Sequence, residues 1–252
     1  MIEASESTHH PDWDFFFTKV DGKISTVALD LGLYHIAPIA GKTFLLWVSV
    51  LLKEATPDGL STEKESQALT EIERYCVKHL QNARYCGRLT GNHHRDLYFY
   101  LSKADEAEDA LQEVRERFSN YKITTGVKSD PEWKIYSDFL YPSPVQLQAI
   151  LNKRLVKHLE SEGLDLSRTY RLLHTLYFKT EANRAGLLNA LEGKRFSVRK
   201  KEQDHDQKEF PYVLQLEDKE TTDLQQIDEY VLRLLKQVLR YEGNYDGWEI
   251  IS

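Results

Sequence analysis

Cysteine is scarce in this sequence, because Cys76 and Cys86 are the only two among 252 residues. Two thiols ten positions apart allow at most one disulfide and exclude a C-x-x-C metal or redox pair. We therefore expect two buried free thiols. Long apolar runs are missing as well. The longest, residues 44–52, is interrupted by Ser49 and falls short of the roughly 18 apolar residues that a membrane span requires.

A positive leader and a basic excess are also lacking. Residues 1–6 are acidic and polar, unlike the positive and apolar regions of a signal peptide, so we expect a cytoplasmic protein without a membrane segment. The net charge is −7. Residues 1–142 hold 16 Lys and Arg against 22 Asp and Glu, and residues 143–252 hold 17 against 18. A protein that follows a nucleic-acid backbone needs a basic excess, so neither half fits that class.

Recognisable catalytic motifs are absent from the chain. No G-x-S-x-G, H-E-x-x-H, Walker A or G-x-G-x-x-G pattern occurs, which leaves hydrolase, NTPase and dinucleotide functions without support. His9 with His10 and His93 with His94 have no third ligand nearby at a metal-binding spacing. We expect a protein that is not an enzyme and that has neither cofactor nor metal.

The first half contains a hairpin followed by an alternation of strands and helices. Alternating apolar residues on either side of Asp21-Gly22 predict a hairpin over residues 13–30. A central strand is expected over residues 43–52. Thr62 with Glu65 forms a capping box for a helix that ends near residue 82. The remaining expected elements are strands 85–90 and 97–101, a helix capped at Ser102, and a strand at 121–128.

The first half closes with a short helix, whose start is predicted by Asp130 before Pro131, and the break at residues 141–144 is the expected domain boundary. The second half opens with a long helix and then repeats the same order of elements. After the long helix we expect strand 171–179, helix 181–192, strands 196–200 and 210–216, a helix capped by Thr222, and an extended tail.

This order of elements, β-α-β-β-α-β in each half, predicts the fold class α+β. Each half would be a ferredoxin-like sandwich, with two helices on one face of a four-stranded antiparallel sheet. The domains would span residues 1–142, with the added hairpin, and residues 143–252.

Three segments of the second half resemble the ribonuclease E inhibitor B family. They are Leu-Tyr-Phe-Lys-Thr-Glu-Ala at 176–182, Gly-Lys-Arg-Phe-Ser-Val at 193–198 and Tyr-Asp-Gly-Trp-Glu at 245–249. The last is the most specific, and the likeness covers residues 144–252. The resemblance implies a ferredoxin-like domain that regulates messenger RNA decay by binding and restraining an endoribonuclease.

The first half is similar to a bacterial domain of unknown function, found alone or ahead of an inhibitor-B-like domain. The residues that carry this likeness lie at 13–17, 37–39, 58–60, 87–90 and 95–100. The single-domain inhibitor lacks such a first half.

The terminal motif is the candidate partner-binding site. It consists of Tyr245, Asp246, Gly247, Trp248 and Glu249. Trp and Tyr are enriched in interface hot spots, but a Trp at such a position is more often a core residue, which a turn at Asp246 and Gly247 would bring onto the sheet. The sequence leaves both interpretations open.

Arg95 and Asp96 at the start of a strand form a second candidate, a polar site at a sheet edge. The alternative, which we favour, is an exposed ion pair at the end of the strand. The acidic outer faces of helix 103–118 are usually only solvated. They could also steer a basic protein segment toward the chain.

The leading functional hypothesis is a regulator that binds a protein partner in RNA metabolism, such as an endoribonuclease. Direct binding of single-stranded RNA is the alternative, because the RNA-recognition fold has the same element order and stacks bases on strand aromatics. Phe210 and Tyr212 match its aromatic pattern only in part. Both glycines of the pattern are missing, Glu209 would repel phosphate, and Pro211 predicts an edge strand.

Overall fold

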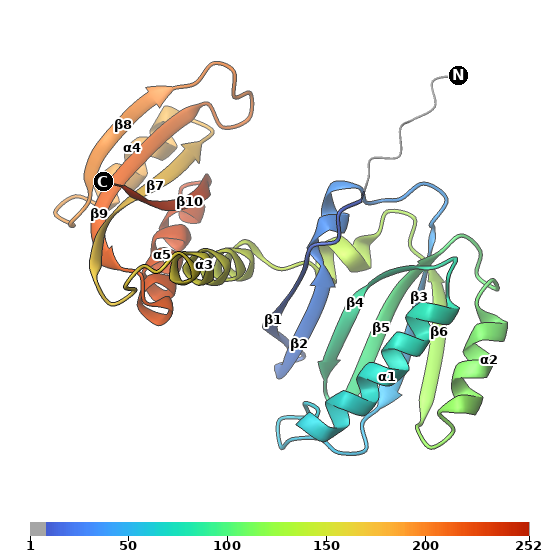
Figure 1. The fold of residues 1–252 in the computed structure, drawn as a ribbon. Coiled ribbons are helices and arrows are strands. Elements are labelled where there is room, and N and C mark those ends of the chain that lie inside the picture. Colours follow the sequence, from blue (N-terminus) through green and yellow to red (C-terminus); the bar gives the residue numbers. More distant parts are fainter. Residues whose placement is uncertain (1–8, 252) are drawn as a thin grey trace. The chain divides into compact units, whose positions relative to one another are not determined.

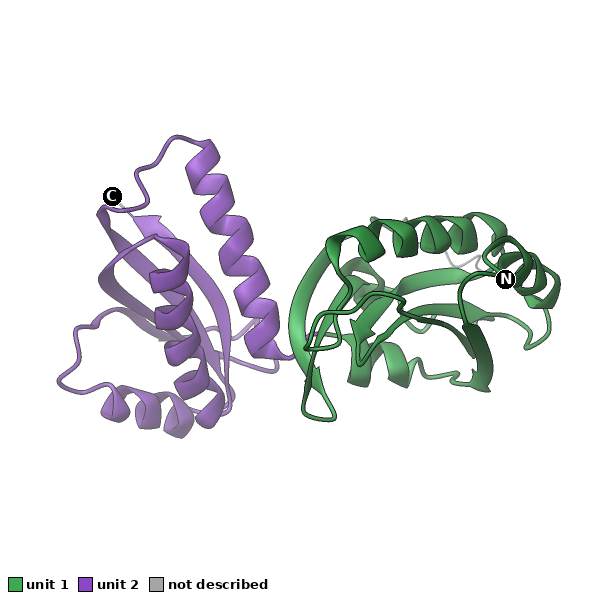
Figure 2. Cartoon of the chain, turned by 90° about the horizontal axis from the view of Figure 1, so that it is seen from below, with its two compact units in different colours: residues 1–141 green, residues 142–252 purple. Residues whose placement is uncertain are grey.

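The computed structural model describes residues 9–251. The expectation about a leader concerns residues 1–6, which lie outside this range. The chain divides into two compact units, the first ending at Tyr141 and the second beginning at Pro142 (Figure 1, Figure 2). Each unit contains one antiparallel sheet together with helices. The α+β class expected from the sequence is therefore confirmed. No helix among the described residues is long and apolar enough to cross a membrane.

The sheet of unit 1 has six strands in the order β1-β2-β4-β5-β3-β6, and every neighbouring pair is antiparallel. The expected hairpin is confirmed, because Asp21 and Gly22 both have positive φ at its turn. The strand expected to be central, β3, lies next to the edge strand β6. The strands are β1 (Trp13–Val20), β2 (Lys23–Asp30), β3 (Phe44–Leu51), β4 (Arg84–Gly91), β5 (His94–Leu101) and β6 (Ile123–Ser129).

Two helices, α1 (Glu63–His79) and α2 (Glu108–Arg117), cover one face of this sheet (Figure 1). Alternate strand residues such as Leu46 and Phe99 pack against helix residues such as Ile72, and the core lies between the two layers. The free thiols Cys76 and Cys86 are buried, as expected. The remaining short helices of the unit are η1 (Leu31–His35) and η2 (Ile135–Leu140).

The helix starts agree with the sequence only in part. The Thr62 hydroxyl accepts the Glu65 N–H and caps α1, as expected. The expected capping box is incomplete, however, because the Glu65 carboxylate accepts the Lys53 N–H at 2.9 Å and the Thr62 N–H donates to the Glu54 carbonyl instead. The cap at Ser102 is wrong, because the Ser102 N–H donates to the Glu106 carboxylate at 2.7 Å and α2 begins only at Glu108.

The helix expected directly after Pro131 also begins late, at Ile135. The Asp130 carboxylate accepts the N–H groups of Lys134 and Ile135, both at 3.0 Å, and so caps the helix from several positions upstream. This arrangement buries Trp133, which stacks on Tyr100 with 3.9 Å between ring centroids. Helix η2 thus covers part of the sheet face opposite α1 and α2.

Unit 2 is a four-stranded antiparallel sheet in the order β10-β7-β9-β8. Ser143 and Gln146 form a full capping box at the start of its first helix, which packs against the last helix. Its elements are α3 (Pro144–Ser161), β7 (Thr169–Phe178), α4 (Glu181–Ala190), β8 (Ser197–Gln203), β9 (Tyr212–Thr221), α5 (Leu224–Arg240) and β10 (Gly243–Ile251).

Two expectations for unit 2 are wrong. Helix α5 is capped by Asp223, whose carboxylate accepts the N–H groups of Gln225 and Gln226, and not by Thr222. Strand β9 is not an edge strand, since it pairs with β7 and β8. Pro211 precedes the first residue of β9, so its missing N–H costs the sheet no hydrogen bond.

Candidate functional site

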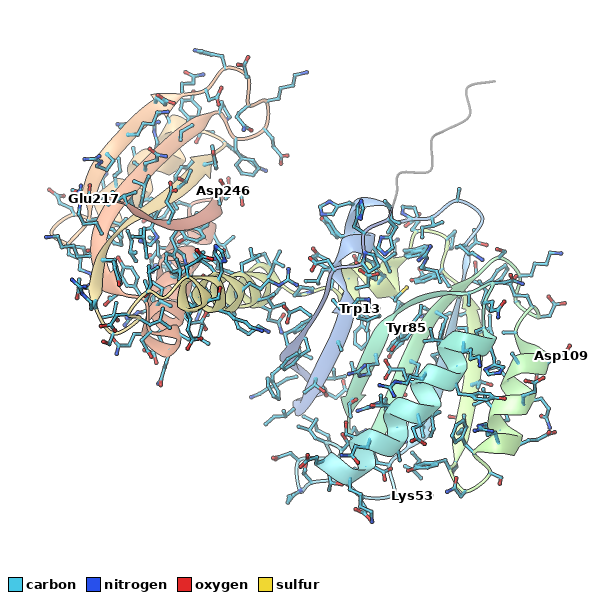
Figure 3. All side chains as sticks on the ribbon, in the orientation of Figure 1. Trp13, Lys53, Tyr85, Asp109, Glu217 and Asp246 are labelled. Atoms are coloured by element: carbon cyan, nitrogen blue, oxygen red, sulfur yellow. The ribbon has the colours of Figure 1, made fainter. Side chains whose placement is uncertain are left out.

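The terminal motif forms part of β10, and its two aromatic residues are buried. Tyr245 and Trp248 are each 7% exposed, whereas Asp246 and Glu249 are exposed (Figure 3 labels Asp246). Residues three apart on a regular strand point to opposite faces of a sheet. The pairing of β10 with β7 shifts between Tyr245 and Gly247, and this bulge brings both rings to the helix-covered face.

Each buried ring of the motif makes a specific hydrogen bond inside unit 2. The Tyr245 hydroxyl lies 2.8 Å from Nδ1 of the fully buried His174 on β7. The Trp248 indole N–H donates to Oδ1 of Asn152 on α3 at 3.0 Å. Asn152 in turn donates to Asp228 on α5 at 2.8 Å. The motif therefore ties the last strand to both long helices.

An aromatic layer lies directly above His174. The rings of Phe196 and Tyr230 meet the imidazole edge-on, with centroids 6.2 and 5.7 Å away. The Tyr230 hydroxyl donates to the buried Asp218 carboxylate. Arg195 lies over the Tyr230 ring at 4.5 Å and its Nε lies 2.8 Å from the same carboxylate. Two aromatic rings and an Arg–Asp ion pair thus lie next to the His174–Tyr245 pair.

This layer forms the floor of a groove of about 510 Å³ between α5, the end of β9 and the loop before β8. Four cationic side chains and one carboxylate, Glu220, line it, and Arg195 is already paired with that carboxylate. The lining residues are Leu191, Lys194, Arg195, Phe196, Glu220, Tyr230, Arg233, Leu234, Lys236 and Gln237. A basic rim over an apolar floor suits a ligand that carries both carboxylates and apolar side chains.

Sequence reasoning found only part of this groove. Lys194 and Arg195 stand out as basic residues in the sequence, but the acidic residues that follow them indicate a solvated loop. Arg233 and Lys236 join them because they lie one turn apart on the exposed side of α5. The spacing of Arg233 and Lys236 is visible in the sequence. That these two residues lie near the loop with Lys194 and Arg195 is known only from the fold.

Arg95 and Asp96 do not pair with each other, so the expected exposed ion pair is wrong. Consecutive strand residues face opposite ways. Arg95 is 4% exposed under α1, where it donates to Thr90 at 3.0 Å and Ser66 at 3.2 Å. Its Nη1 lies 3.9 Å from the Glu73 carboxylate. Asp96 is half-buried on the other face of the sheet.

The residues behind the RNA and metal alternatives do not gather into a site. Tyr212 faces the helices, since Arg184 of α4 lies 5.3 Å over its ring, and Phe210 precedes β9. Within residues 9–251 no group of three His, Cys, Asp or Glu could hold a metal ion.

The fold defines the chain as an α+β protein of two units. Each of the two units matches a known protein family. Residues 11–141, just over half of the chain, match a family of unknown function, DUF695, and the chain belongs to this family. Residues 149–250 match the family described as regulator of ribonuclease activity B. Both resemblances stated from the sequence are confirmed, in the expected order.

Other comparisons add little. No curated protein matches the sequence. Among solved structures, one described as an unknown protein from Galdieria sulphuraria is similar at 11% identity. The match covers 84% of the present chain and 99% of that chain, with a TM-score of 0.23.

Proposed function

We propose that the chain is a non-catalytic regulator that binds a protein partner in RNA metabolism, in the first instance a ribonuclease. The observation that carries the proposal is the match of residues 149–250 to a family of regulators of ribonuclease activity. No family of enzymes is among those matched. The net charge of −7 and the nearly balanced charge of the second half favour a protein partner over a nucleic acid.

We place the partner contact in the groove of unit 2. A partner segment with acidic and apolar side chains would complement Lys194, Arg233 and Lys236 above the Phe196 and Tyr230 rings. Within the terminal motif, Tyr245 would support this floor through His174. Exposed Asp246 and Glu249 would remain accessible to the partner. Trp248 would act by holding β10 against α3.

Each unit is proposed to be a ferredoxin-like domain, with boundaries at residues 1–142 and 143–252. In unit 2 the order β7-α4-β8-β9-α5-β10 accompanies the sheet order β10-β7-β9-β8. In unit 1 the order β3-α1-β4-β5-α2-β6 accompanies β4-β5-β3-β6, with the β1–β2 hairpin added beside β4. These orders support the assignment, because a split β-α-β unit leaves room for one strand between its two parallel strands.

Direct RNA binding is the second candidate, and the open face of the unit 2 sheet argues against it. There Glu217 accepts from Arg171 at 2.7 Å and lies 3.2 Å from Arg199 (Figure 3 labels Glu217). Both guanidinium groups are therefore paired with the Glu217 carboxylate. An RNA phosphate would have to displace this carboxylate before it could bind either arginine.

The test is a pull-down from lysate of the source cells, with and without nuclease, read by mass spectrometry. The double variant Arg233→Glu/Lys236→Glu is compared with Lys208→Glu/Lys219→Glu, which changes the net charge equally at exposed positions outside the groove. We expect the unaltered chain and the control variant to recover a ribonuclease both with and without nuclease treatment. The groove variant should fail to recover it. The purified protein should also slow that ribonuclease. Loss of every partner after nuclease would support RNA binding instead.

A further inference from the structure

The sheet face of unit 1 that α1 and α2 leave uncovered carries a trough of about 390 Å³. Residues of β3, β5 and β6 form its floor, and η2 forms one wall. The trough is lined by Leu45, Trp47, Ser49, Asp96, Tyr98, Thr124, Lys128, Ile135 and Phe139. Most of these side chains are apolar or aromatic, and Asp96 is the one carboxylate among them.

The aromatic floor of the trough depends on a glycine. Trp47 on β3 is paired with Tyr98 on β5 and with Gly126 on β6. A Cβ atom placed on Gly126 would lie 2.0 Å from Cζ2 of the Trp47 ring. The indole therefore lies against the bare backbone of β6, where no other residue type leaves room for it. Phe139, which is 44% exposed, adds an aromatic edge from η2.

Asp96 is the one carboxylate in this apolar setting. Among the described residues it forms no ion pair within 4 Å, although the Ser49 side chain hydrogen-bonds to it and the charge of His94, two residues before it on β5, acts on it. Burial is the largest influence on the pKa of Asp96 and raises it, whereas Ser49 and His94 lower it. Lys128 lies four residues along β6 from Thr124, the residue in line with Asp96 and Ser49. Four strand residues span roughly 13 Å along β6. Lys128 forms no ion pair with Asp96 among the described residues.

We propose that this trough binds an alkylammonium group, with the ammonium on Asp96 and the aliphatic chain across Trp47 and Tyr98. A cation would give the half-buried carboxylate a charge-assisted hydrogen bond. The faces of aromatic rings also attract cations and cover methylene groups. The ligand is either a free aliphatic amine or the lysine side chain of a peptide, which share this chemistry. The proposal is independent of the ribonuclease partner of unit 2.

The experiment is calorimetric titration of the full chain at neutral pH with n-hexylamine and with an end-blocked lysine. n-Hexanol and hexanoate serve as ligands of similar length without the positive charge. We expect hexylamine to bind with a dissociation constant on the order of 1 mM. Hexanol should bind at least about tenfold more weakly, because it lacks the charged hydrogen bond. Stronger binding of the blocked lysine would identify a peptide as the source, and stronger binding of hexylamine a free amine.

Asp96→Asn is the decisive variant, because it keeps the side-chain shape and removes the charge. It should weaken hexylamine binding by about ten- to a hundredfold. Asp109→Asn is the matched control, since Asp109 lies exposed on α2, on the helix side of the sheet (Figure 3), and should leave binding unchanged. Equal affinity in Asp96→Asn and the unaltered chain, tighter binding of hexanoate, or no binding of either amine would overturn the proposal. Circular dichroism of each variant verifies that the fold is intact.

Discussion

His174 is the residue whose protonation state most constrains unit 2. Its imidazole is fully buried, with Nδ1 on the Tyr245 hydroxyl and without a hydrogen-bond partner for Nε2 within the described part of the chain. Burial and, to a smaller extent, the positive charge of Arg195 lower the pKa of His174 to about 4. The folded protein therefore holds a neutral imidazole at neutral pH.

This burial predicts that acid destabilises unit 2 through His174. The unfolded chain takes up a proton near the ordinary histidine pKa of about 6.5, whereas the folded chain does so only near 4. The contribution of the neutral His174 to the free energy of unfolding is fully present above the higher pKa. It is lost progressively as the pH falls toward the lower pKa. The loss through this residue is about 3 kcal/mol over that window.

Urea titrations at several pH values between about 7.5 and 4.5 measure this effect. His174→Asn is the control, because its amide can still meet the Tyr245 hydroxyl but does not titrate. The variant should be less stable at neutral pH and lose less stability on acidification. Parallel pH profiles for the two proteins would contradict the assignment of a low pKa to His174.

The faces on which single residues lie were only partly predictable. A period of two assigns Leu46, Phe99 and similar residues to the core, and these are where the pattern puts them. The same rule puts Tyr245 and Trp248 on opposite faces of the sheet. It fails there because a bulge adds one residue to β10. Gly247, with φ of +131°, is the local signal of that bulge, but glycine also occurs in ordinary turns.

At the scale of elements, the sequence predicted the existence and order of strands and helices better than their ends. Thr222 and Asp223 are adjacent and both belong to the residue types that cap helices. Which of them caps α5 depends on how β9 ends. Asp223 faces the free N–H groups, while the Thr222 hydroxyl is buried without a hydrogen-bond partner among the described residues.

Asp223→Ala should therefore destabilise the protein by about 1 kcal/mol, because two N–H groups at the start of α5 lose their acceptor. Thr222→Val should be neutral or stabilising, since it replaces an unsatisfied buried hydroxyl with a methyl group of similar size. Urea unfolding of the two variants beside the unaltered chain measures both effects. The reverse ranking would restore Thr222 as the cap.

At the scale of the molecule, the repeated order of elements predicted two independent cores. Unit 1 has one between the β3–β5 pair and helices α1 and α2, and unit 2 has one between its sheet and helices α4 and α5. The groove and the trough were beyond prediction, because each is assembled from elements that are distant in sequence. Residues 194–196 meet Arg233 and Lys236 only through the fold, and Asp96 meets Trp47 only through strand pairing.

Separate production of residues 1–141 and 142–252 should therefore give two folded proteins. A unit of more than 100 residues with its own apolar core buries enough surface to be stable alone. Each should unfold in one cooperative transition, and in urea the larger unit should have the steeper dependence, since that slope scales with the surface exposed. Far-ultraviolet circular dichroism and proton NMR spectra record folding. If the second unit is unfolded alone yet folded in the full chain, the two cores are not independent, and the groove must then be studied only in the full chain.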